Sequence, residues 1–88
     1  MSAMNQEEIA RTLRTLLGRI APDADVHGLD PAADLARSLE LDSMDFLGFL
    51  TAIHKELGVA IAETDYAQVR TLAGCVDYVT AHRPARSR

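Results

Sequence analysis

The chain has 88 residues, enough for one small domain but not for two. Acidic residues outnumber basic ones by 13 to 9, which argues against a nucleic-acid binder, since such proteins normally present a basic face. Cys75 is the single cysteine and cannot form an internal disulfide, and no apolar run is long enough to span a membrane. The first residues lack the basic and apolar segments of a signal peptide. We therefore expect a cytoplasmic monomer that binds neither nucleic acid nor a membrane.

An amphipathic helix is the first predicted element, beginning after Asn5 and ending before Pro22. Asn5 and Glu8 have the spacing of a capping box, in which each side chain binds the other residue's backbone. Apolar residues then recur at helical spacing, as one buried face requires: Ile9, Leu13, Leu16, Leu17 and Ile20. Residues 21–41 follow as a long connection, broken by prolines and a glycine, with one short helical turn at about residues 32–38. Loops of this length in compact domains are often functional.

A second long helix is predicted from Ser43 to Leu57. Asp42 is a suitable N-cap residue, Asp45 occupies the third helical position, and Gly58 is suited to end the helix. An inward-facing stripe of apolar residues runs along this helix: Leu47, Leu50, Ile53 and Leu57, widened by Phe49.

Two further helices complete the predicted fold. A short one covers residues 63–69, and a last one is capped by Thr71 and stopped by Pro84. Residues 83–88 are basic and are expected to form a flexible tail. No alternating strand pattern interrupts this series. The sequence therefore predicts an all-α fold, a small four-helix bundle of three main helices and one short helix, forming a single domain with its core at about residues 5–82.

Ser43 is placed where a helix begins, directly after an aspartate cap and a long loop. The first amides of a helix have no internal partners, and the helix dipole adds partial positive charge there. A phosphate ester on Ser43 would thus lie at a position that favours anions, and the hydroxyl would face solvent, where a modifying enzyme can reach it. On its own, this pattern is more typical of an ordinary capped helix.

The stretch around Ser43 resembles the acyl carrier proteins, whose second helix begins with Asp-Ser-Leu followed by Asp or Glu. Here methionine replaces leucine in Asp42-Ser43-Met44-Asp45. Further stretches resemble the same family along the chain: Leu39-Glu40-Leu41 resembles its Leu-Gly-Leu, Glu56-Leu57-Gly58-Val59 with Ile61 resembles the exit of its second helix, and Thr71-Leu72 with Val76-Asp77-Tyr78-Val79 resembles its last helix. The resemblance covers about residues 5–82.

This resemblance implies that Ser43, between Asp42 and Met44, accepts 4'-phosphopantetheine from coenzyme A through a Mg-dependent phosphopantetheinyl transferase. The thiol of that arm then holds acyl groups as thioesters. The expected function is an acyl carrier protein that presents acyl intermediates to acyl-loading ligases or synthases of fatty acid, polyketide or specialised biosynthesis. Two alternatives stay open: an aminoacyl or peptidyl carrier of nonribosomal synthesis, and an unmodified helical adaptor.

Ser43 is expected to be an attachment point and not a catalytic nucleophile. A nucleophilic serine needs a base within hydrogen-bond reach, whereas His54 lies eleven positions further along the same helix, roughly 16 Å away. We therefore predict no enzyme activity. The histidines and the cysteine lack zinc spacing, and the aspartates of residues 23–34 match a calcium loop poorly, so no metal site is predicted.

In the acyl carrier family, exposed residues of the second helix contact partner enzymes, commonly through acids. The residues assigned to this role here are Asp45, Phe46, Gly48 and Lys55. Gly48 stands where the family commonly has glutamate, which leads to the hypothesis that this chain docks by shape and apolar contact and serves a specialised pathway. The alternative is that Gly48 reflects drift and that Phe46 belongs to the core.

Family members shelter the acyl chain in a cleft between helices. The residues expected to line such a cleft here are Leu47, Phe49, Leu50, Ile53, Ile61 and Val76. Phe49 would shorten the cleft and so favour short or polar cargo. The alternative for each of these residues is a plain packed core.

Overall fold

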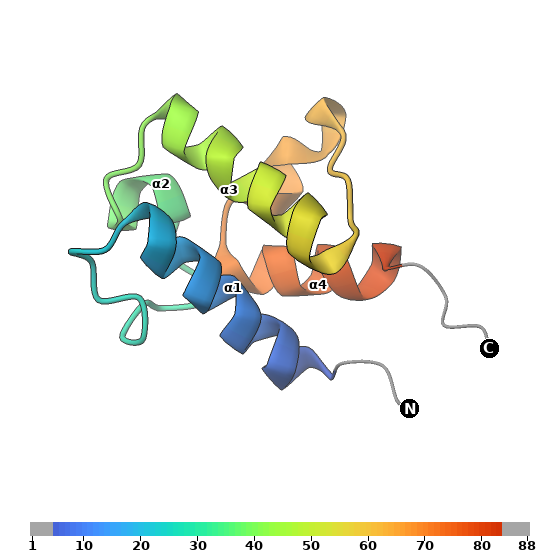
Figure 1. Cartoon of the computed structure of the whole chain (residues 1–88), viewed down its shortest axis with the longest axis horizontal. Coiled ribbons are helices and arrows are strands. Elements are labelled where there is room, and N and C mark those ends of the chain that lie inside the picture. Colours follow the sequence, from blue (N-terminus) through green and yellow to red (C-terminus); the bar gives the residue numbers. More distant parts are fainter. Residues whose placement is uncertain (1–4, 84–88) are drawn as a thin grey trace.

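The computed structural model describes residues 5–83, which form helices joined by loops (Figure 1). α1 spans Gln6–Ile20, and the predicted capping box fixes its start. Asn5 Oδ1 accepts from the Glu8 backbone N–H at 2.8 Å, and Glu8 Oε1 accepts from that of Asn5 at 2.9 Å. The buried residues of α1 all belong to the predicted apolar face: Ile9, Leu13, Leu16 and Leu17.

The long connection after α1 lies against the bundle because Arg14 fastens it. The Arg14 guanidinium donates hydrogen bonds to the backbone carbonyls of Val26 and Leu29, whose side chains are buried. The connection contains one helical turn, α2 (Leu35–Ser38), inside the range where the sequence predicts one. Asp34 caps this turn.

α3 spans Ser43–Leu57, the predicted range, and both of its ends have the expected caps. Asp42 Oδ1 accepts from the Asp45 N–H at 2.8 Å, and Asp45 Oδ2 accepts from the Asp42 N–H at 3.4 Å, which completes a capping box. Gly58 follows the helix in the left-handed conformation, with a φ of 73°, where a side chain would be strained.

The last two elements also match their predicted ranges. The short helix η1 spans Glu63–Val69 and has the tighter 3₁₀ geometry. α4 spans Leu72–His82, and Thr71 caps it by accepting from the Gly74 N–H at 2.9 Å. The predicted stop at Pro84 and the rest of the predicted tail beyond Arg83 lie outside the described residues.

One hydrophobic core holds these elements together. α1 packs against both α3 and α4, and η1 packs against α4 (Figure 1). Phe49 of α3 is the largest of the fully buried side chains, and no charged residue among residues 5–83 is buried. The predicted all-α bundle is confirmed, since the β pairing found in this range is a single isolated bridge between Asp34 and Thr71. Over the same range, no helix combines the length and the apolar character needed to cross a membrane.

Candidate functional site

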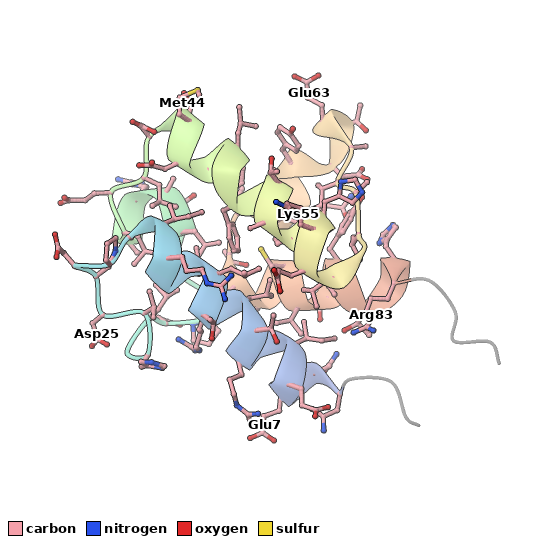
Figure 2. The ribbon with its side chains drawn as sticks, in the orientation of Figure 1. Glu7, Asp25, Met44, Lys55, Glu63 and Arg83 are labelled. Carbon is pink, nitrogen blue, oxygen red and sulfur yellow. The ribbon has the colours of Figure 1, made fainter. Side chains whose placement is uncertain are left out.

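Ser43 is the first residue of α3, and its side chain is exposed. The capping box between Asp42 and Asp45 fixes the backbone on both sides of it. Met44 is 74% exposed, and its side chain points away from the bundle (Figure 2). The structure thus presents the Ser43 side chain to solvent at a helix start, where the sequence places it.

A cleft of about 350 Å³ lies beside Ser43, between α2, the start of α3 and η1. Its apolar part is formed largely by Leu41, Phe46 and Tyr66. The rings of Phe46 and Tyr66 pack edge to face, with their centroids 6.2 Å apart. The remaining lining residues are Asp34, Ala36, Asp42, Ala67 and Arg70. A group attached to Ser43 therefore has a largely apolar surface next to it.

Asp34 and Arg70 form a charged part of the cleft wall. Asp34 Oδ2 accepts from Arg70 Nε at 3.0 Å and from Arg70 Nη2 at 2.7 Å, while Oδ1 accepts from the Arg37 backbone N–H at 3.0 Å. The hydrogen bond from the Arg37 N–H, together with the Arg70 guanidinium, lowers the pKa of Asp34 below its ordinary value. The Arg70 carbonyl also accepts from the Leu35 N–H at 2.7 Å. These contacts join α2 to the end of η1.

The four residues predicted to contact partners lie on α3 but differ in exposure. Gly48 and Lys55 are exposed, whereas Asp45 and Phe46 are partly buried. Asp45 is held by the capping box, and Phe46 lines the cleft beside the serine. A Cβ atom on Gly48 would meet Ile20 Cδ1 at an ordinary 3.9 Å, so packing does not require glycine there.

The six residues predicted to line a cargo cleft do not gather around one cavity. Phe49 and Ile53 are fully buried in the core. Val76 is partly buried against the core. The others border a second hollow, of about 360 Å³, between α3 and residues 60–66: Leu47, Leu50 and Ile61. The cleft beside Ser43 is lined by none of the six.

Sequence reasoning missed the walls of the Ser43 cleft that come from α2 and η1, above all Tyr66 and Arg70. Arg70 contacts Asp34, which lies 36 positions earlier in the sequence, and no local sequence pattern predicts a contact at that separation. The sequence signal that could have located part of this wall was Asp34, because an aspartate before a helical turn is typical of an N-cap residue.

No histidine is among the residues that line the cleft beside Ser43. His54, the histidine on the same helix, borders the second hollow instead. Cys75 is buried, and this burial raises the pKa of its thiol to about 12, which keeps the thiol protonated at neutral pH. Residues 5–83 contain no group of three or more His, Cys, Asp or Glu residues that could hold a metal ion.

The family model described as "Phosphopantetheine attachment site" matches residues 7–79, and the chain belongs to this family of carriers. The group carried by the family is 4'-phosphopantetheine. The chain is also similar along most of its length to proteins named acyl carrier protein. The resemblance seen in the sequence is thereby confirmed.

Three of these relatives show how far the similarity reaches. The one from Thermosynechococcus vestitus is 26% identical over 76 residues, which are 86% of this chain and 93% of the relative. The one from Acidothermus cellulolyticus is 27% identical over 79 residues, or 88% and 90% of the two chains. The one from Lactobacillus acidophilus is 22% identical over 80 residues, which are 91% of this chain and 99% of the relative.

Proposed function

We propose that this chain is an acyl carrier protein whose 4'-phosphopantetheine arm is attached to the hydroxyl of Ser43. The observation that carries the proposal is the exposed side chain of Ser43 at the first position of α3, inside the range that matches the family. The names of the relatives support the acyl class of cargo. In this proposal residues 5–82 act as one carrier domain.

The residues around Ser43 suit the proposed group. Asp42 caps α3 and so holds the serine at a helix start, which favours the negative charge of a phosphodiester. Met44 adds exposed apolar surface next to the attachment point, and the cleft adds Phe46 and Tyr66. When bound, the group supplies a terminal thiol that holds an acyl chain as a thioester.

The proposed cargo is an acyl intermediate of fatty acid, polyketide or specialised biosynthesis, loaded by a ligase or a synthase. Phe49 and Ile53 fill the interior of the bundle, so a long alkyl chain finds little space along the cleft predicted from the sequence. This packing favours short or polar cargo. An aminoacyl or peptidyl carrier would use the same serine, whereas an adaptor would not need it. The cytoplasmic location and the monomeric state stay predictions.

The proposed docking surface for partner enzymes is the exposed side of α3, whose two acids, Asp45 and Glu56, both have a contact within the chain. Asp45 is held in the capping box, and Glu56 lies 4.0 Å from Arg19. Met44 and Leu47 are 74% and 41% exposed and provide apolar surface. We therefore favour partner binding by shape and apolar contact over binding by charge.

The attachment is tested by incubating the purified chain with coenzyme A, Mg²⁺ and a broad-range phosphopantetheinyl transferase. The intact mass is expected to rise by one phosphopantetheine. Ser43→Ala should abolish this gain, whereas Ser38→Ala, which changes an exposed serine at the end of α2, should leave it intact. A chain that gains no mass would contradict the proposal and favour the adaptor alternative, and so would a Ser43→Ala variant that is still loaded.

A further inference from the structure

The attachment point lies among acidic residues. Asp42 and Asp45 flank Ser43 in the capping box, and Glu40 lies three residues before it. A phosphodiester on Ser43 would add another negative charge to this group, and like charges at such short separations repel one another. The start of α3 contributes only a partial positive charge. A nearby cation would relieve the repulsion.

Arg70 is the single cation among the residues that line the cleft beside Ser43. Its side chain is 62% exposed, so a ligand in the cleft can reach it. A guanidinium has five N–H donors in a planar fork, and Asp34 engages it only through Nε and Nη2. The edge between Nη1 and Nη2 is the one that matches two oxygens of a phosphate.

Asp34 holds Arg70 in a defined orientation. Both carboxylate oxygens of Asp34 are engaged, since Oδ1 caps α2 and Oδ2 accepts from Arg70. The backbone of Arg70 is fixed as well, because its carbonyl accepts from the Leu35 N–H at 2.7 Å. A guanidinium that is already oriented loses less conformational entropy when it binds an anion.

We propose that Arg70, oriented by Asp34, binds the phosphodiester that joins the arm to Ser43. This inference rests on the proposed attachment at that serine. Arg70 is then a positioning residue: the N–H groups that Asp34 does not engage bind the phosphate and hold the base of the arm against the apolar wall formed by Phe46 and Tyr66.

The first test compares thermal unfolding of the unmodified and the loaded chain, in the wild type and in Arg70→Gln, at low salt. The change in Tm on loading is measured for each protein. This change should be less favourable for Arg70→Gln than for the wild type, by roughly 3 °C or more. The difference should shrink near 1 M salt, because the screening length there is only about 3 Å. Arg37→Gln is the matched control, since Arg37 is an exposed arginine of α2 that does not line the cleft, and it should behave like the wild type.

The second test is ³¹P NMR of the loaded chain. The phosphodiester signal should shift between the wild type and Arg70→Gln, and Arg70→Lys, which keeps the charge but lacks the fork, should fall between them. Equal responses to loading in all variants, with the same ³¹P signal, would overturn the inference and leave the attachment at Ser43 intact. If Arg70→Gln does not fold, the inference is tested on the wild type alone. A ³¹P signal of the loaded wild type that does not change with salt would then overturn the inference. A chain that takes up no arm would overturn both proposals.

Discussion

Tyr78 of α4 donates its hydroxyl to the Asp65 carboxylate of η1 at 2.7 Å, and this hydrogen bond joins the last helix to the short one before it. The Tyr78 ring is buried and stacks on the ring of His82, with the centroids 3.9 Å apart. The hydrogen bond to Asp65 raises the pKa of Tyr78, because the carboxylate accepts from the neutral phenol and repels the phenolate.

Tyr78 should therefore stabilise the fold at neutral pH and lose this effect in alkali. Its folded pKa is raised above the unfolded value of about 10, so its contribution is complete below that pH and is lost as the pH rises through the folded pKa. Tyr78→Phe should lower the Tm by a few degrees at pH 7. It should also reduce the additional decrease in Tm that the wild type shows at high pH. Circular dichroism melts between pH 7 and 11 measure both effects. A variant as stable as the wild type at pH 7 would contradict the assigned role.

Gly74 lies where the first turn of α4 meets the end of η1. A Cβ atom there would come within 2.2 Å of the Gln68 carbonyl oxygen and 3.1 Å of Thr71 Oγ1. Gly74→Ala should therefore force the two elements apart and cost about 1–3 kcal/mol of stability, measured by denaturant unfolding. Gly18→Ala in α1 is the control, because its Cβ would meet Val26 Cγ2 at an ordinary 3.7 Å. That control should gain up to about 1 kcal/mol, and equal losses in both variants would rule out the clash.

Glu40 adopts a left-handed backbone conformation, with a φ of 56°, just before the Asp42 cap. This conformation costs a residue with a side chain about 1–2 kcal/mol, and the resembling stretch of the acyl carrier family has glycine there. Glu40→Gly should stabilise the fold by up to about 1 kcal/mol, after the greater freedom of glycine in the unfolded chain is included. Glu40→Ala removes the same charge but keeps the strain, so it should bring no gain. Urea titrations of the two variants would disprove the strain if their midpoints coincided.

The helix boundaries could be predicted because each depends on residues that are close in sequence. The starts follow from the caps at Asn5, Asp42 and Thr71, and the end of α3 follows from Gly58. Each of these residues satisfies the backbone groups that a helix end leaves unpaired, or takes a conformation that only glycine adopts easily. The position of Ser43 at the start of α3 follows from the Asp42 cap, whereas its proposed role follows from the resemblance of the surrounding stretch to the acyl carrier proteins.

The cleft could not be predicted because its walls are brought together only by the tertiary fold. Arg70 and Asp34 are 36 positions apart, and the two rings of the apolar wall come from α3 and η1. Periodicity shows which face of a helix turns inward, but it does not show whether space remains between packed faces. Phe49 and Ile53 illustrate this point: the sequence left open whether they line a cargo cleft or belong to a packed core, and the structure buries both completely.

Binding of a partner enzyme to α3 should depend weakly on salt, because apolar surface dominates the proposed docking face. Leu47 is 41% exposed, and Leu47→Ser should weaken binding about tenfold, whereas Thr80→Ala on an exposed position of α4 should not change it. The space at Gly48 admits a side chain, so Gly48→Glu can restore the acid that the family commonly has there. With this acid, the affinity for a basic partner should fall more steeply as the salt concentration rises. These effects are measured by comparing the affinity for the phosphopantetheinyl transferase at low salt with that at high salt. A steep fall of the wild-type affinity with salt would show that charge, and not apolar contact, directs the docking.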